Sequence, residues 1–492
     1  MLWIGLYLPE LSVQIAERGA TRPGPALVIK EGPEQRPRVV AANAQAQRGG
    51  VHVGMAVAAA QALLGDLRVL PRKPDAEQAA LRQLACWAGQ FTPAIIVEPE
   101  QGLLLEVSAS LRLFKGLENL LSDIRQGLHG LGYRASCGVA PTAGAAWLLA
   151  QARAAGHTAR GCHRLAELSD CLDALPLVHC PWSAERLAML HTLGIKRLGQ
   201  MRALPRPELA RRFGPELLNY LDQVFGRLPD PRPFYTPPER YRARSEFMQE
   251  VFAVEALLFS LKRLLLELEG FLRARDAGVQ RFVLCFEHDD RRHAPTRLSV
   301  GLLAPERAAA RLLMLARERL EQNPPGAPVI AIIVEADELL PYAPDNQSLL
   351  PDTRRQALDW RQLRERLQAR LGEDKLFVLQ PGDDHRPELA TVLAADTRKV
   401  KKASRKAAPL DYPPRPCWLL PEPRPLAVRA DQPQYQGPLR LLAGPERLET
   451  GWWDGRRVNR DYYVARNAAG ETLWIYREHR APRGWFLHGL FA

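Results

Sequence analysis

The sequence is poor in cysteine and contains no long apolar run. Only 7 of its 492 residues are cysteine, at irregular spacings, which is a pattern that excludes a disulfide framework and favours a reducing cytoplasm. No apolar stretch approaches the length of a membrane-spanning helix. The opening MLWIGLYLPELSVQIAERGA has no basic leader or small-residue cleavage site and reaches a charge at Glu10, so it predicts a buried first strand rather than a signal peptide. These absences predict a cytoplasmic protein without a membrane segment.

Acidic residues are in deficit. Lys plus Arg number 67 against 55 for Asp plus Glu, which gives a net charge of +12. An excess of this size favours a polyanionic partner such as nucleic acid. The length, with 46% hydrophobic residues, is sufficient for several packed cores.

Proline-rich segments divide the chain. The first is Asp230 to Pro238, the second Pro341 to Pro351, and the third Asp396 to Pro425, which begins with the basic run Arg398 to Ala408. Closely spaced prolines remove backbone donors and disfavour helix. We therefore expect a domain boundary at the first segment and a mobile tether at the third.

The spacing of apolar residues predicts an α+β, multidomain fold. Before the first break, short alternating segments and Ala/Leu-rich stretches predict a mixed sheet covered by helices. Leu175 to Arg227 is helical throughout. Arg240 to Ala336 predicts strand, helix, strand, strand, helix and strand, which is the split βαβ order.

Several short strings together carry a family resemblance. Four of them are similar to the Y-family translesion DNA polymerases over about the first 340 residues: AANAQAQRGGVHVGM, LEVSASLRLFKG, GVAPTAGAAWLLA and LGIKRLGQM. The tail strings GPERLETGWWDG, DYYVARN and GWFLHGLFA resemble the ImuB branch of that family. The resemblance implies a right-hand arrangement of palm, fingers and thumb, followed by a little finger and a C-terminal aromatic-rich module.

The implied domains run in chain order. They are the first palm strand with the fingers entry (1–24), fingers (25–71), palm (72–164), thumb (165–229), little finger (239–340), a linker (341–437) and a partner-binding module (438–492). The linker is expected to hold a clamp motif, an amphipathic helix at 352–371 and the basic tether.

The resemblance also implies a metal site whose carboxylates are missing here. The family's metal ligands align with Gly5, Gln101 and Gly102, and its triphosphate contacts align with Ala44, Gln47 and Trp147. Nucleotidyl transfer needs clustered carboxylates to hold magnesium. We therefore expect no catalysis, metal or cofactor. Glu98, Glu100 and Glu106 lie near enough to keep an active metal-dependent translesion polymerase open as the alternative.

Two segments are candidates for DNA binding. Ser183 can cap a helix that ends near His191, and Gly194 then turns the chain into a second helix opened by Lys196; backbone amides there could receive a phosphate. An ordinary corner between two helices would use the same glycine. The second candidate is a row of arginines projecting from one strand face, with a solvated edge strand as its alternative; its members are Arg240, Arg242 and Arg244, joined by Arg297.

Two clusters of potential metal ligands are assigned no chemistry. Cys162, His163, Cys171, His179 and Cys180 contain no Cys-x-x-Cys pair, so buried thiols are the better interpretation than zinc ligands. The charged run 287–293 falls where two strands must turn, and its charges are expected to be solvated.

Two further segments point to protein partners. Residues 346–351 resemble the clamp-binding motif of bacterial polymerases, with Gln347 and Leu350 in its two anchor positions and Pro351 where an aromatic ring belongs; a plain linker is the alternative. In the tail, aromatic residues build a core or mark an interface, and Trp452, Trp453, Tyr462 and Tyr463 are the candidates. A stacking surface for single-stranded DNA is the runner-up.

The resemblance implies a function in damage-induced mutagenesis during the SOS response. It is that of a non-catalytic scaffold in the mutasome, which binds primer-template DNA and the sliding clamp. The implied protein partners are a RecA-like accessory subunit of the ImuA type and an error-prone replicative-type polymerase. A damage-sensing DNA-binding regulator without clamp contact is a third possibility.

Overall fold

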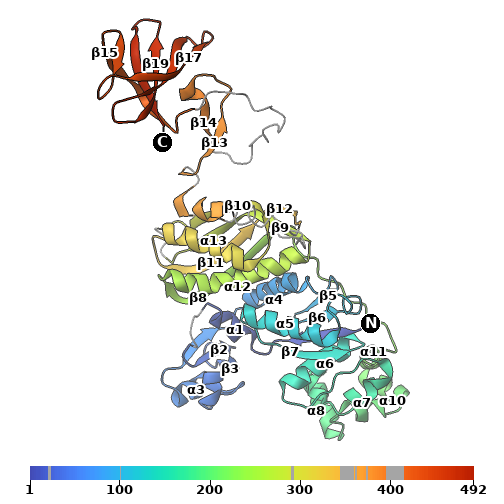
Figure 1. Cartoon of the computed structure of the whole chain (residues 1–492). Helices are drawn as coiled ribbons and strands as arrows, with labels where there is room; N and C mark the ends of the chain where they lie inside the picture. The colour runs from blue at the N-terminus through green and yellow to red at the C-terminus, as the bar shows by residue number, and fades with distance from the viewer. Residues whose placement is uncertain are drawn as a thin grey trace. The chain divides into compact units, whose positions relative to one another are not determined.

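The computed structural model describes residues 1–19, 24–99, 101–289, 293–343, 360, 363–368, 370–372, 375–394 and 415–491. The chain forms two compact units, Met1–Arg370 and Leu371–Ala492 (Figure 1). Gln347, Leu350, Glu100 and the basic tether lie outside the described residues. No helix among the described residues is long and apolar enough to cross a membrane.

A four-stranded antiparallel sheet forms the palm of the first unit. Its order is β5-β6-β1-β7, and its strands are β1 (Trp3–Tyr7), β5 (Ile95–Glu98), β6 (Gly102–Glu106) and β7 (Ser136–Ala140). Side chains alternate along β1, so Ile4 and Leu6 pack under α4 (Pro74–Ala88) and α5 (Leu117–Leu131). The opposite face of the sheet lies against α6 (Ala143–Ala154).

Glycines allow α6 to approach the sheet closely. Gly5 and Gly138 are paired across β1 and β7. A Cβ on Gly5 would lie 2.6 Å from the carbonyl oxygen of Ala146, and one on Gly138 would overlap the same oxygen. Any larger residue at either position would push the helix away from the sheet.

The fingers are a small three-stranded sheet in the order β3-β2-β4. Asn43 joins the strands to the next helix, because its Oδ1 accepts from the backbone amides of Leu27 and Ala46. This side chain caps α2 and ties it to β2. The elements are α1 (Leu11–Glu17), β2 (Leu27–Glu31), β3 (Arg38–Ala42), α2 (Ala44–Arg48), α3 (Val57–Leu63) and β4 (Arg68–Pro71).

The thumb is helical throughout. The expected cap of α8 is confirmed, since Ser183 Oγ accepts from the amide of Arg186 at 3.3 Å. The elements are η1 (Leu165–Glu167), α7 (Leu168–Leu172), η2 (Leu177–His179), α8 (Ala184–Thr192), α9 (Leu198–Arg202), α10 (Arg206–Phe213) and α11 (Pro215–Val224).

The little finger has the predicted split βαβ order. Its sheet runs β10-β9-β11-β8, with β12 beside β9, and its core lies between that sheet and the two helices. The elements are β8 (Tyr241–Val251), α12 (Val254–Arg273), β9 (Ala277–Glu287), β10 (Thr296–Glu306), α13 (Ala309–Gln322), β11 (Val329–Ala336) and β12 (Leu339–Pro341).

A buried ion pair joins the little finger to the palm. Arg18, just after α1, pairs with Glu267 of α12, and their side chains are 5% and 1% exposed. Arg18 also donates to Tyr133 Oη at 2.7 Å and to the carbonyl of Leu131 at 3.0 Å. Burial raises the pKa of Glu267, while Arg18 opposes that shift. A carboxylate, a phenol oxygen and a carbonyl oxygen therefore replace the water molecules that the Arg18 guanidinium loses on burial.

The second unit extends the C-terminal module beyond the predicted boundary. Its sheet has the order β16-β15-β20-β19-β18-β17, and β15 and β16 lie inside the predicted linker 341–437. The 438–492 boundary is therefore wrong. The elements are β13 (Val378–Pro381), η4 (Pro387–Leu389), β14 (Thr391–Ala394), β15 (Trp418–Arg429), β16 (Gln432–Gln434), β17 (Arg440–Thr450), β18 (Val458–Arg466), β19 (Thr472–Glu478) and β20 (Gly484–Leu490).

Candidate functional site

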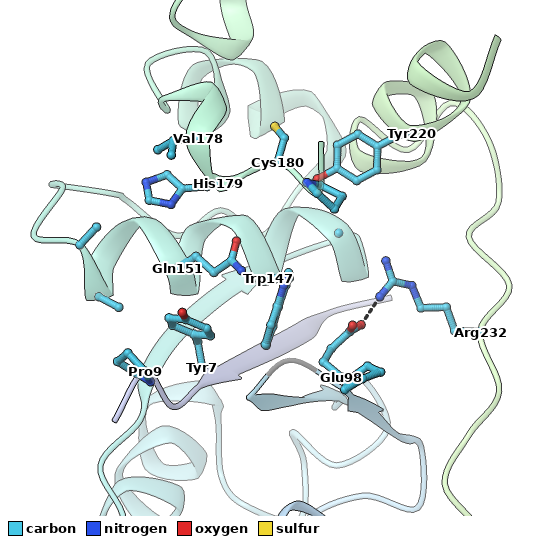
Figure 2. A pocket seen from close by; sticks show the side chains of 15 residues that line it. Tyr7, Pro9, Glu98, Trp147, Gln151, Val178, His179, Cys180, Tyr220 and Arg232 are labelled. Atoms are coloured by element: carbon cyan, nitrogen blue, oxygen red, sulfur yellow. Dashed lines mark hydrogen bonds and ion pairs between the residues drawn. The ribbon is translucent and has the colours of Figure 1, made fainter. Parts of the chain in front are cut away.

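A cavity of about 640 Å³ lies between the palm and the thumb, and Tyr7, the neighbour of Gly102 across the sheet, lines it. Figure 2 shows its labelled side chains, among them Tyr7 from β1, Trp147 and Gln151 from α6, and His179 and Tyr220 from the thumb. Aromatic rings therefore line a space that would have to hold two metal ions.

The strand register identifies the degenerate position on β1 as Tyr7 rather than Gly5. Tyr7 pairs with Gly102, whereas Gly5 pairs with Leu104 and lies beneath α6. Two carboxylates can share a metal only from neighbouring positions, and Tyr7 is the β1 residue that meets this condition beside Gly102. The assignment of Gly5 is corrected because the predicted alignment was displaced by two residues along the strand.

Trp147 occupies the space where a carboxylate at position 102 would lie. Its ring contacts Tyr7 edge to face, with centroids 5.4 Å apart. A Cβ built on Gly102 would lie 2.5 Å from the Trp147 ring and would overlap the carbonyl oxygen of Leu6. In the amide orientation that satisfies both neighbours, Gln151 accepts from Trp147 Nε1 at 3.2 Å and donates to the His179 carbonyl at 2.8 Å. The indole is therefore held in place.

The remaining carboxylates near the cavity have other partners. Glu98 pairs with Arg232, as the dashed line in Figure 2 marks, and Arg232 also contacts Asp230 at 2.8 Å. Glu106 Oε1 accepts from the amides of Leu2 and Ser108, both at 3.2 Å. Among the described residues, no group of three or more His, Cys, Asp or Glu side chains could hold a metal ion.

The positions aligned with triphosphate contacts carry no cation. Ala44 begins α2. Gln47 Nε2 donates to the Ala42 carbonyl at 2.8 Å and to Glu10 Oε1 at 3.3 Å. With Trp147 in place of the third contact, none of these three side chains can neutralise a phosphate.

The thumb hairpin differs from the predicted phosphate site. Gly194 has the left-handed φ of +78° that the turn requires. However, the amide of Gly194 donates to the His191 carbonyl at 3.0 Å, and the amides of Lys196 and Arg197 donate to Gln200 Oε1 at 2.8 and 3.1 Å. The prediction of free amides is wrong because Gln200 caps the second helix itself. A phosphate would have to displace Gln200 or use the exposed Lys196 side chain.

The arginine face of the little finger is also partly neutralised. Residues 241–246 alternate buried and exposed, so Arg242 and Arg244 do share a face. Glu335 accepts from Arg242 at 3.2 Å and from Arg297 at 2.7 Å, and Arg244 pairs with Glu246 and with Glu287 at 2.7 Å. Arg240 is exposed just before β8. Glu287 and Glu335 were missed because they come from strands distant in sequence, whereas Glu246 lies two residues from Arg244 on the same strand.

The cysteine cluster has the character of buried thiols. Burial raises the pKa of both Cys162 and Cys180 to about 12. Zinc binding requires thiolates, whereas burial favours the neutral thiol form of both groups.

The tail aromatics divide into a core and an exposed pair. Tyr462 is only 1% exposed; it stacks on Trp474 at 4.1 Å and hydrogen-bonds His488 Nδ1 at 2.9 Å. Tyr463 is half-buried against Trp485. The prediction that Tyr462 contacts a partner is therefore wrong, because the ring is packed inside the module. Trp452 and Trp453 are 70% and 56% exposed.

The chain is similar to one protein family model, to curated relatives and to several solved structures. Residues 12–151 match the model of the impB/mucB/samB family. Protein ImuB from two strains of Caulobacter vibrioides is 31% identical over 477 residues, which are 90% of this chain and 100% of the relative. Among solved structures, DinB from Sulfolobus solfataricus is 17% identical with a TM-score of 0.38. An insertion ternary complex of Dbh DNA polymerase is 19% identical with a TM-score of 0.40. Each covers 70% of this chain and 100% of the solved chain.

Proposed function

The chain belongs to the ImuB family, and from this premise we propose that it is a non-catalytic, Y-family-polymerase-like scaffold for translesion synthesis. It would bind primer-template DNA and the sliding clamp and recruit an error-prone polymerase to damaged DNA. Its place would be in a damage-induced, SOS-type mutagenesis complex in the cytoplasm.

The observation that carries the proposal is that, among the described residues, aromatic rings rather than a cluster of carboxylates line the palm–thumb cavity. Tyr7 stands on β1 beside Gly102 of β6, and Trp147 packs against both of these positions, which would have to supply the metal ligands. Metal-assisted nucleotidyl transfer depends on carboxylates that neutralise two cations at this point. Glu98, the nearest acid that lines the cavity, is already paired with Arg232. This arrangement supports binding rather than chemistry.

DNA binding is proposed for the thumb hairpin and for the arginine face. Arg242 and Arg297 are 65% and 60% exposed and share one carboxylate, Glu335. A phosphate can replace Glu335 as the acceptor without burying a new charge. Contacts of this kind follow the backbone and carry no sequence information.

Recruitment is proposed for the segments beyond the little finger. Gln347 and Leu350 would contact the clamp as a short peptide. The C-terminal unit would hold the RecA-like accessory subunit and the error-prone polymerase. A short peptide motif with two anchor side chains binds modestly, on the order of micromolar.

The test of recruitment is clamp capture by the full-length chain. Replacing both Gln347 and Leu350 with alanine should abolish clamp binding and damage-induced mutagenesis, while Asn346→Ala with Ser348→Ala serves as the matched control. Removing residues 371–492 should release the partner proteins and leave clamp and DNA binding intact. Survival of clamp binding in the Gln347/Leu350 double variant would show that the contact lies elsewhere.

A further inference from the structure

Two adjacent tryptophans project from the turn between β17 and β18. Trp452 and Trp453 are 70% and 56% exposed, and their rings meet edge to face with centroids 4.7 Å apart. Exposed tryptophan pairs are costly in water and are concentrated at protein interfaces. The turn therefore has the composition of a binding surface.

A buried arginine from a distant segment holds this turn. Arg386, between β13 and β14, has a side chain only 3% exposed. Its guanidinium contacts Asp384 at 2.6 Å, Asp454 at 2.6 Å and the Arg456 carbonyl at 3.1 Å, and it lies 5.9 Å from the Trp453 ring. A planar guanidinium can satisfy two carboxylates and a carbonyl at once, which fixes the turn in one geometry.

The backbone of the turn is shaped around this arginine. Gly451 has φ +80°, and a Cβ there would lie 2.9 Å from Arg386 Nη1 and 2.6 Å from the Arg456 carbonyl. Only glycine allows both groups to approach. The presentation of the two tryptophans thus depends on a residue some 65 positions earlier in the chain.

Exposed arginines lie in the tryptophan turn and in the neighbouring turn between β19 and β20. Arg480, in the turn between β19 and β20, donates to the Arg457 carbonyl at 2.8 Å, which brings the two turns together. The side chains of Arg456, Arg480 and Arg483 have no carboxylate partner among the described residues, whereas Asp454 is already bound to Arg386. The surface therefore combines apolar rings with unpaired cations.

We propose that this surface, Trp452, Trp453, Arg456, Arg480 and Arg483, docks a protein segment whose apolar side chains are flanked by Asp or Glu, and that Arg386 is its positioning residue. The inference deepens the proposed recruitment function and rests on it. Apolar side chains would pack on the rings, and the carboxylates would pair with the arginines. Successive bases of single-stranded DNA need parallel open ring faces, and the 80° angle between these rings does not supply them.

The test uses the full-length chain and three labelled synthetic peptides, which alternate Leu and Phe with Glu, Gln or Lys. The Glu peptide should bind about tenfold more tightly than the Lys peptide. Replacing Trp452 and Trp453 with alanine should weaken the affinity for the Glu peptide by about tenfold or more. Trp418→Ala is the matched control, because Trp418 is 67% exposed in the same module.

Positioning by Arg386 is tested by fluorine NMR on chain labelled with 5-fluorotryptophan. Arg386→Gln should shift and broaden the Trp452 and Trp453 resonances and weaken the Glu peptide, while Arg480→Gln should weaken the peptide without altering those resonances. If Arg386→Gln destabilises the module, the Trp452/Trp453 and Arg480 variants still test the docking surface, because they do not remove the buried arginine. An unshifted spectrum in Arg386→Gln overturns its positioning role.

Equal binding of the three peptides, or no binding, overturns the docking surface. An oligo-dT probe that perturbs the same two resonances while the Glu peptide does not would assign the surface to single-stranded DNA instead. In either case the scaffold function stands provided that removal of residues 371–492 still releases the partner proteins. The two failures are therefore distinguishable.

Discussion

The palm–thumb cavity and the β17–β18 turn both carry tryptophan, and they use it in opposite ways. Trp147 lies between Tyr7 and the backbone of Gly102 inside the first unit, held by Gln151. Trp452 and Trp453 project into solvent from the second unit, held from below by Arg386. In the cavity the indole packs against the strand positions aligned with metal ligands, whereas in the turn the two indoles are exposed and available for binding.

The two units differ in where they place charged side chains and aromatic rings. The first unit retains the strands and helices of a polymerase hand but has replaced its charged centre with packed rings. In the second unit, the buried Arg386 lies against the turn that carries the exposed Trp452 and Trp453. The proposed function of recruiting another enzyme would use an exposed binding surface such as that of the second unit and would not need a charged catalytic centre.

The largest expected effect of a single substitution is on the stability of the first unit. Glu267→Ala should lower its free energy of unfolding by roughly 3–5 kcal/mol, because it leaves the buried Arg18 guanidinium without a counter-charge. Urea unfolding measures this. Arg134→Ala is the control: Arg134 is 69% exposed and 3.7 Å from Glu10, so its loss should cost about 1 kcal/mol or less. Equal costs for the two variants would show that the palm–little finger contact is not the buried one described.

The next effect is a pH dependence confined to the second unit. Burial lowers the pKa of His488 to about 4 from 6.5, with Glu388 opposing the shift. The unfolded chain therefore binds a proton between these two values that the folded module does not. Stability should fall as pH drops from about 6.5 to about 4, by at most roughly 3 kcal/mol.

Thermal melting of His488→Gln compared with the wild type measures this dependence. Asp461, whose pKa Arg447 holds down at about 2, stabilises the module at neutral pH and adds to the pH dependence only below about 3.8, where protonation of the carboxylate removes that stabilisation. Identical pH profiles for His488→Gln and the wild type would remove His488 as the cause.

The smallest effect is on DNA affinity and has opposite signs for two variants. Replacing Arg242, Arg244 and Arg297 with Gln should lower the slope of log affinity against log salt by about 1 to 3, since each phosphate contact contributes about 0.9. Glu335→Gln should instead strengthen binding, because it frees Arg242 and Arg297. Fluorescence anisotropy over a salt series measures both. Unchanged salt slopes for the arginine variant, or weaker DNA binding by Glu335→Gln, would show that DNA does not contact this face.

The sequence alone predicted the order of helices and strands better than it predicted which side chains from different strands contact each other. The order of the little finger follows from local periodicity, which determines where strands and helices form. The pairing of Arg242 and Arg297 with Glu335 depends on strand neighbours far apart in the chain. The displacement from Gly5 to Tyr7 depends on register, which a short apolar strand does not encode locally.

The C-terminal module was predicted too short for a specific physical reason. The sequence of β15, WLLPEPRPLAVR, was interpreted as linker because of its prolines. In the sheet the register shifts between Leu419 and Arg424, so Pro421 and Pro423 fall in an irregular stretch, while Pro425 lies in the regular ladder opposite Phe486. Arg386 was missed because nothing local to it marks a contact with Asp454.

The most direct test of the account is primer extension with the purified full-length chain in excess over a labelled primer-template, in magnesium and in manganese. DNA binding is measured in the same mixture. A variant that restores the aligned carboxylates, with Tyr7→Asp, Gln101→Asp and Gly102→Glu, is assayed beside it. The account predicts bound DNA and no added nucleotide for either protein, because Gly102 lies against Trp147 and Gln101 has a left-handed φ of +102°. Template-directed extension by the wild-type chain that is lost on Glu98→Gln or Glu106→Gln would contradict it.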